Sequence, residues 1–210
     1  MGQTGHSEKL HVGQFNPSSL VKIIVYALAV LGVLGTVASI VANPERGWAG
    51  YLIGFVFVSL ISLGGLFVVV INNMASAGWS VTIRRFAEAM TSFFPVIVIG
   101  SLVLLAGVKY LYPWANADYM AATPLVAGKA AYLNVPFMTI RMLVFSLGAL
   151  LFACLIVGNS LKQDKTGDVA LTKKNVPLSI GYIVFFAIFF SLFMVDLLMT
   201  LLPTWYLTIF

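Results

Sequence analysis

Two residues of opposite charge lie inside stretches that are otherwise apolar, and such residues are candidates for chemistry in a membrane protein. Arg141 lies about six residues into one stretch and Asp196 about six residues before the end of the next, so both sit about 9 Å below the same surface. We expect the two side chains to be close, directly or through a polar bridge. Asp196 is then a candidate to carry a proton or to contact the headgroup of a ligand. The alternatives are a purely structural ion pair and an Arg141 side chain that reaches up to the interface.

A second charged group interrupts the apolar sequence at residues 77–90, which read AGWSVTIRRFAEAM. Arg84 and Glu88 are four residues apart and can pair on one helix face, next to Arg85. This pattern predicts an amphipathic connector, either at the membrane surface or as a buried polar element of a working site. Glu88 is correspondingly either a point of proton uptake from the cytoplasm or one half of a solvated ion pair. The apolar face of the connector consists of Trp79, Ile83, Phe86 and Met90.

The composition is that of an integral membrane protein. The chain has 210 residues, of which 60% are hydrophobic and 9% are charged, whereas a soluble domain carries about 25% charged residues. The net charge of +5 does not indicate nucleic acid, because the basic residues are spread over the loops and form no stripe with stacking aromatic residues. An excess of cationic residues in loops is instead typical of proteins that obey the positive-inside rule.

Five segments are long and apolar enough to cross about 30 Å of hydrocarbon as helices. We therefore predict an all-α integral membrane protein with a polar cytoplasmic tail, residues 1–19, and a transmembrane bundle, residues 20–210. The connector described above joins the second and third spans, and a turn at 43–47 joins the first two. Tyr110, Tyr112 and Trp114 at the end of the third span are predicted to form an interfacial belt. The predicted spans are about 20–42, 49–71, 93–111, 135–157 and 178–202.

The lysines and arginines predict the orientation of these spans. More of them fall on the side of the N-terminus, so the positive-inside rule places that end in the cytoplasm. That side holds Lys9, Lys22, Arg84, Arg85, Lys162, Lys165, Lys173 and Lys174. The other side holds Arg46, Lys109, Lys129 and Arg141.

The sequence offers little for a cofactor or for catalysis. Its two histidines, His6 and His11, lie in the polar tail, so we expect no haem ligated by this chain. The single cysteine, Cys154, cannot hold an iron–sulfur cluster and is interpreted as a small buried hydrophobic residue. No catalytic residue is assigned, because no nucleophile–base pair, phosphate loop, metal cluster or dinucleotide fingerprint is visible.

Three stretches in order resemble a known family, the F-type integral membrane subunit of bacterial alternative complex III. The first is the connector at 77–90, and the second is GKAAYLNVPFMTIRMLVF at 128–145. The third is DLLMTLLPTWYLTIF at 196–210. The chain departs from the family at Leu202, often acidic in relatives, and at Thr204, often histidine, which puts a proton relay through those positions in doubt.

The resemblance implies a subunit of a respiratory complex that oxidises membrane quinol, with the fold of polysulfide-reductase-like membrane subunits. Relatives of this kind are proposed to handle quinol or to conduct protons. The implied site residues are Asp196, Arg141, Glu88, Arg84 and Arg85. The implied partners are an iron–sulfur protein, a multihaem cytochrome c, a homologous membrane subunit and a terminal oxidase. Haem c and the iron–sulfur clusters would be held by those partners, with quinol as a candidate ligand here.

Two other interpretations stay open, and the length of the chain bears on all three. The family has about ten helices, so five spans predict half of such a subunit. The chain could instead be the quinone-binding anchor of a related polysulfide or molybdopterin-type reductase. It could also be half of a secondary transporter, whose binding site would lie near broken helices. Pro95 and Pro136 are expected at the starts of spans, which argues against broken helices.

Overall fold

The computed structural model describes residues 17–76 and 81–204, and within them every regular element is a helix. Five helical segments are long and apolar enough to cross a membrane, as the sequence predicted. They are Ser19–Ala42, Pro44–Met74, Ile83–Ala106, Val135–Thr166 and Ala170–Leu201. These five helices make the chain a multi-pass membrane protein of the all-α class.

The first two helices meet at a single residue. Helix α1 (Ser19–Ala42) ends where Asn43 begins helix α2 (Pro44–Met74), because the Asn43 side chain accepts a hydrogen bond from the Arg46 amide at 3.1 Å. Pro44 occupies the first turn of α2, where the N–H that proline lacks would have no partner anyway. The predicted turn at 43–47 is therefore wrong for residues 44–47, which form the first turn of α2.

The amphipathic connector is confirmed as a helix over residues 81–90, while its first four residues, with Trp79, lie outside the described residues. The helix is continuous with the third span. Helix α3 (Val81–Met90) passes through a 3₁₀ turn, η2 (Thr91–Phe93), into α4 (Phe94–Ala106). The apolar span therefore begins at Ile83, about ten residues before the predicted start. Pro95 lies in the first turn of α4, as predicted, although the continuous apolar segment begins twelve residues earlier, at Ile83.

Four short helical segments follow the third span; the first lies within the predicted span 93–111, and the other three lie between the predicted spans 93–111 and 135–157. They are α5 (Val108–Leu111), η3 (Pro113–Ala115), α6 (Ala117–Ala122) and α7 (Pro124–Ala127). Tyr112 and Trp114 are buried among these segments, so the predicted interfacial belt is wrong for both residues, while Tyr110 is exposed. The short helices close one end of the bundle.

The last two long helices form a hairpin. Helix α8 (Val135–Thr166) ends at Gly167, whose backbone adopts a left-handed conformation (φ 69°) that glycine takes without strain. Helix α9 (Ala170–Leu197) follows and leads into the short η4 (Met199–Leu201). Both helices extend several residues beyond the spans predicted at their junction. Cys154 on α8 is exposed, so the prediction that it is buried is wrong.

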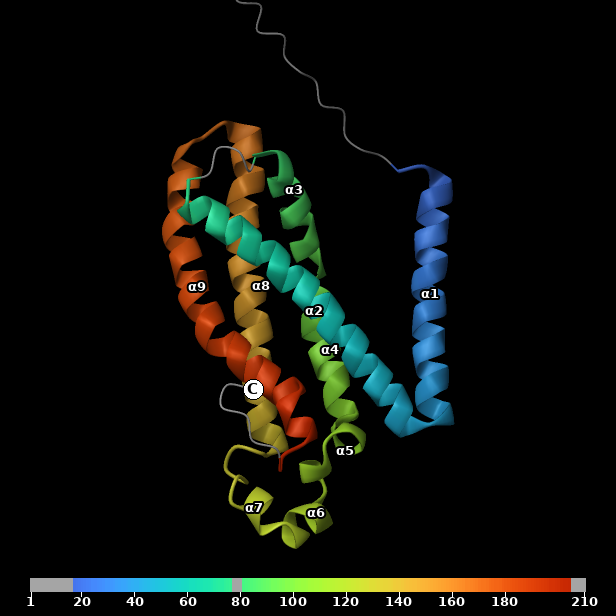
Figure 1. The fold of residues 1–210 in the computed structure, drawn as a ribbon. Coiled ribbons are helices and arrows are strands. Elements are labelled where there is room, and N and C mark those ends of the chain that lie inside the picture. Colours follow the sequence, from blue (N-terminus) through green and yellow to red (C-terminus); the bar gives the residue numbers. More distant parts are fainter. Residues whose placement is uncertain (1–16, 77–80, 205–210) are drawn as a thin grey trace, which may run out of the picture.

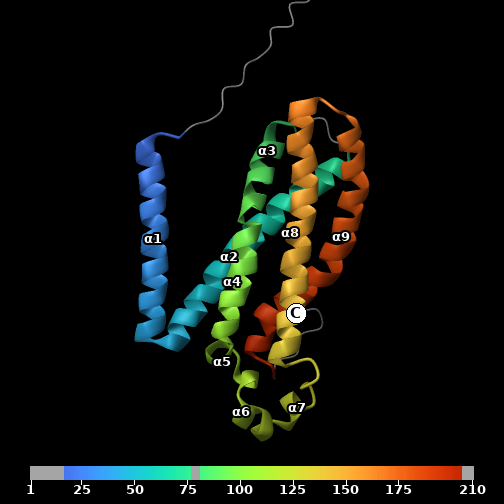
Figure 2. The same cartoon turned by 180° about the vertical axis from the view of Figure 1, so that it is seen from behind.

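Figures 1 and 2 show a bundle of α2, α3–α4, α8 and α9, with α1 standing apart at its edge and approaching α2 near the junction of the two helices. No residue of α1 is buried. We call the end with α3 and the α8–α9 junction the upper end, and the end with α5, α6 and α7 the lower end. Phe193 packs against both Phe55 and Phe145 in the core between the two ends.

Candidate functional site

The predicted meeting of Arg141 and Asp196 is confirmed, and the contact is direct. Arg141 Nε donates to one Asp196 carboxylate oxygen at 2.7 Å, and its Nη2 donates to the other at 2.6 Å. This two-point geometry is the strongest form of an arginine–carboxylate pair. The side chains are 9% and 1% exposed, so the pair is shielded from solvent and Arg141 does not reach up to the interface.

The Arg141 guanidinium is enclosed by more than its carboxylate. The Tyr132 ring lies 3.8 Å from its central carbon and the Phe137 ring 4.2 Å from it, and both are cation–π contacts. The Tyr132 carbonyl accepts two further hydrogen bonds from the guanidinium, at 3.3 and 3.4 Å. The guanidinium is thus held by a carboxylate, a backbone carbonyl and two aromatic rings.

Local structure positions the groups that meet here. Asn134 caps α8 by accepting a hydrogen bond from the Phe137 amide at 2.9 Å, which fixes where the preceding connection turns into the helix. Arg141 then faces the bundle nearly two turns further along α8. Asp196 lies in the last turn of α9, where Thr200 donates to its backbone carbonyl at 2.7 Å. The lower ends of α8 and α9 are therefore the elements that form the site.

Sequence reasoning missed two tyrosines of this site. Tyr132 had no charge to mark it, and its contact with Arg141 comes from the connection before α8. Tyr112 is fully buried and donates from its hydroxyl to the Leu197 carbonyl at 3.1 Å, beside Asp196 in sequence. Burial, reinforced by the negative charge of Asp196, raises the pKa of the Tyr112 hydroxyl. Tyr112 is predicted from the sequence to be an interfacial aromatic residue, and Tyr132 lies in the family-like stretch 128–145 but receives no role there.

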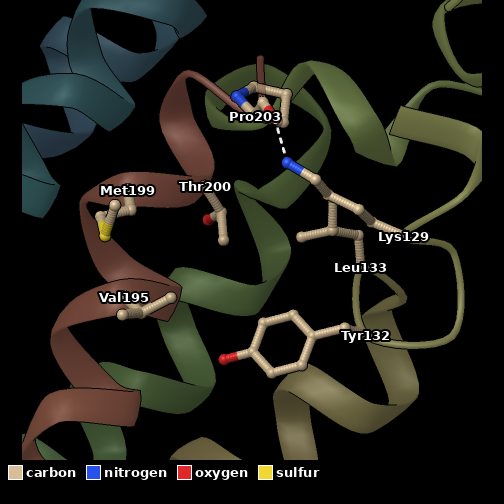
Figure 3. Close-up of a pocket in the computed structure, with 7 residues that line it drawn as sticks. All are labelled: Lys129, Tyr132, Leu133, Val195, Met199, Thr200 and Pro203. Carbon is tan, nitrogen blue, oxygen red and sulfur yellow. Dashed lines mark hydrogen bonds between the residues drawn. The ribbon is translucent and has the colours of Figure 1, made fainter. Parts of the chain in front are cut away.

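A cavity of about 260 Å³ opens next to the pair. Figure 3 shows the Tyr132 hydroxyl pointing across this cavity toward α9, and Lys129 donating to the Pro203 carbonyl at 3.0 Å. The buried Tyr132 hydroxyl has no hydrogen-bond partner among the described residues. Burial and then the charge of Asp196 raise its pKa to about 12, although Arg141 opposes the shift. The lining residues are Lys129, Tyr132, Leu133, Val195, Met199, Thr200 and Pro203.

A second charged cluster lies at the upper end, on α3. Glu88 accepts hydrogen bonds from Arg84 at 2.9 Å and from Arg85 at 2.5 Å, which confirms the predicted Arg84–Glu88 pair. Glu88 is 5% exposed, so the interpretation of a solvated pair is wrong for the carboxylate. Arg85 also pairs with Asp164 on α8, a partner that sequence reasoning did not identify. The cluster joins α3 to α8.

The structure does not bring the two charged groups together. Glu88 lies in the upper part of the bundle and Asp196 at the lower end of α9 (Figure 1). Aromatic rings occupy the core above the Arg141–Asp196 pair, where Phe145 stacks with Phe185 and lies 4.5 Å from Phe193 between ring centres. The five predicted site residues therefore form two separate clusters.

The Arg141–Asp196 pair can hold α8 and α9 together, and the cavity beside it can enclose a small ligand at the lower end of the bundle. Within the described residues, no group of three or more histidine, cysteine or acidic side chains could hold a metal ion. No protein-family model matches the chain, and a search of curated proteins found no match of significant similarity. Fold and site thus define a class, a multi-pass helical membrane protein with a buried ion pair.

Proposed function

We propose that the chain is a membrane subunit of a respiratory quinol oxidoreductase complex of the alternative complex III type. It would lie in the bacterial inner membrane with its N-terminus in the cytoplasm. Three sequence stretches that resemble the family in the same order support this proposal. Two of those stretches, 128–145 and 196–210, supply Tyr132, Arg141 and Asp196, which meet in one site. Partner subunits with iron–sulfur clusters and haem c would hold the redox centres.

Within such a complex, we assign the subunit a structural task in preference to proton conduction. One observation carries this choice, namely the enclosure of Arg141 by Asp196, Tyr132 and Phe137. A carboxylate that binds and releases protons has to part from its counter-ion, and separating a buried pair costs about 3–5 kcal/mol. The pair therefore serves better as a clamp that shapes the lower end than as a carrier of protons.

The test uses the whole complex purified through a tag on another subunit. Asp196→Asn should lower the recovery of the iron–sulfur and cytochrome c subunits, because it leaves the Arg141 guanidinium buried without a negative partner. The double variant Arg141→Met/Asp196→Leu replaces the pair by apolar side chains of similar volume and should restore recovery. Asp118→Asn, which changes an exposed carboxylate on α6 at the same end, is the matched control and should behave as wild type.

Proton release per quinol oxidised, measured in liposomes, separates the two tasks. The structural task predicts that the assembled double variant releases as many protons per quinol as wild type. Fewer protons from an assembled double variant would assign Asp196 to a proton path. Failure of the wild-type chain to co-purify with any iron–sulfur or cytochrome c subunit would reject membership in such a complex.

A further inference from the structure

The junction of α8 and α9 carries a concentration of exposed lysines that the proposed function does not use. We call residues 158–176 the basic tip; it forms the upper end of the α8–α9 hairpin (Figure 2). All four of its lysines are exposed. They are Lys162 and Lys165 on α8, and Lys173 and Lys174 on α9.

Hydrogen bonds between the two helices give the basic tip a defined shape. The Asn159 amide donates to the Asn175 side-chain oxygen at 2.8 Å, and the Asn175 amide donates to the Ile156 carbonyl at 3.0 Å. Nearer the junction, Thr172 donates to Gln163 at 2.9 Å. Asn175 is buried, so its bonds are shielded from competing solvent. The lysines therefore project from a pre-organised surface.

Both carboxylates of the basic tip are engaged within the protein. Asp164 forms an ion pair with Arg85 of α3. Asp168 accepts a hydrogen bond from the Ala170 amide at 2.9 Å, at the start of α9. Among the described residues, none of the four lysines forms an ion pair, since the salt bridges there involve only arginines. The tip therefore carries four exposed lysines against two carboxylates, a formal net charge of +2, and one of those carboxylates is paired with Arg85.

The four lysines lie close, along their helices, to exposed apolar side chains. Leu161, which is 51% exposed, comes directly before Lys162, and Lys165 is one turn further on. On α9, the apolar side chain of Ile180 is 49% exposed and lies six residues after Lys174. At 1.5 Å per residue, each lysine is within about 10 Å of an exposed apolar side chain. A flexible lysine at that height reaches the interface, where lipid phosphates lie.

We propose that the basic tip binds the phosphate groups of anionic phospholipids. Lysine ammonium groups are compact point charges that suit phosphate oxygens, and juxtamembrane clusters of them attract anionic lipid. The height of the lysines favours a lipid over an acidic protein, because a protein partner would have to displace the headgroups to reach Lys162 and Lys174. The proposal is independent of the respiratory assignment and of the direction in which the chain faces.

The full chain in detergent, titrated with phosphatidylglycerol or with phosphatidylcholine and followed by native mass spectrometry, tests this proposal. The double variant Lys162→Gln/Lys174→Gln should raise the apparent Kd for phosphatidylglycerol by about 10- to 30-fold, since each lysine near an anionic surface contributes about fivefold. Its affinity for phosphatidylcholine should not change. The matched control is Arg46→Gln/Lys109→Gln, which neutralises two exposed cations at the lower end.

The control double variant should keep the wild-type affinity for phosphatidylglycerol. Thermal unfolding checks that both double variants remain folded, which we expect because all four substituted side chains are exposed. Unchanged phosphatidylglycerol binding by Lys162→Gln/Lys174→Gln would overturn the proposal. An equal loss in the control, or equal binding of the two lipids by the wild-type chain, would overturn it as well.

Discussion

Arg141 shows how a charge is accommodated in the apolar part of this protein. Its guanidinium donates to Asp196 and to the Tyr132 carbonyl, and two rings cover it. Each contact offsets part of the cost of removing the charge from water. The carboxylate was foreseeable from matching depths in two spans, because helical rise converts residue number into height. The rings were not, since apolar and aromatic residues are common throughout these spans.

We predict that the Tyr132 ring stabilises the protein and that its hydroxyl does not. Tyr132→Phe should leave stability within about 0.5 kcal/mol, because the hydroxyl has no hydrogen-bond partner among the described residues. Tyr132→Ala should cost about 1–3 kcal/mol, because it removes a cation–π contact and apolar packing around Arg141. Thermal unfolding in detergent micelles measures both. Equal destabilisation by Phe and Ala would show that the hydroxyl matters instead.

Alkaline pH provides a second readout of the same residue. The pKa of Tyr132 rises to about 12 in the folded chain from an ordinary value near 10. Between these pH values the unfolded chain binds fewer protons than the folded one, so the free energy of unfolding falls as the pH rises. Ionisation of Tyr132 therefore costs no stability below about pH 10, and its cost grows until the pH reaches about 12. The Tyr132→Phe variant should lose less stability over this window than Tyr110→Phe, which removes an exposed hydroxyl at the lower end.

At the scale of elements, close packing decides where the amphipathic helix α3 lies. A Cβ atom added at Gly65 of α2 would come 2.7 Å from the Ala87 carbonyl oxygen and 2.7 Å from Met90 Cβ. Small residues permit this approach between helices in a membrane. The α3 helix therefore packs along α2 and continues into the third span, where the sequence alone equally allowed a helix lying on the membrane surface.

Two adjacent glycines allow a matched test of this contact. Gly65→Ala should destabilise the protein by about 1–3 kcal/mol, because the methyl group would push α3 away from α2. Gly64→Ala meets nothing within 4 Å and should be neutral or slightly stabilising, since alanine is the better helix former. Unfolding in micelles with increasing sodium dodecyl sulfate compares them. Similar stability of the two variants would contradict the close contact of α2 and α3.

At the scale of the whole molecule, five spans place the upper and lower ends on opposite sides of the membrane. Lys165 of the basic tip and Asp118 of α6 are exposed residues at the two ends. The cationic excess predicts that the upper end faces the cytoplasm. The orientation decides which end would contact the proposed periplasmic redox subunits; with the upper end in the cytoplasm, it would be the lower end.

Labelling of single cysteines tests the orientation. In a Cys154→Ala background, a membrane-impermeant maleimide should label Asp118→Cys in intact spheroplasts and Lys165→Cys only in inverted vesicles. The two variants serve as controls for each other, because both sites are exposed in the fold. Labelling of both from one side would contradict the five-span topology, and the reverse pattern would contradict the predicted orientation.

The sequence by itself determined the class of fold, the number of spans and the pairing of Arg141 with Asp196. These features follow from long apolar runs and from the cost of a charge in lipid, which are properties of single segments. Only the tertiary structure decided which apolar residues are buried, since lipid accepts an exposed Cys154 as readily as the protein interior does. It also decided that Tyr132 encloses Arg141, that Asp164 reaches Arg85, and that Glu88 is shielded. Those contacts join residues from separate elements, and helix packing alone sets their distances.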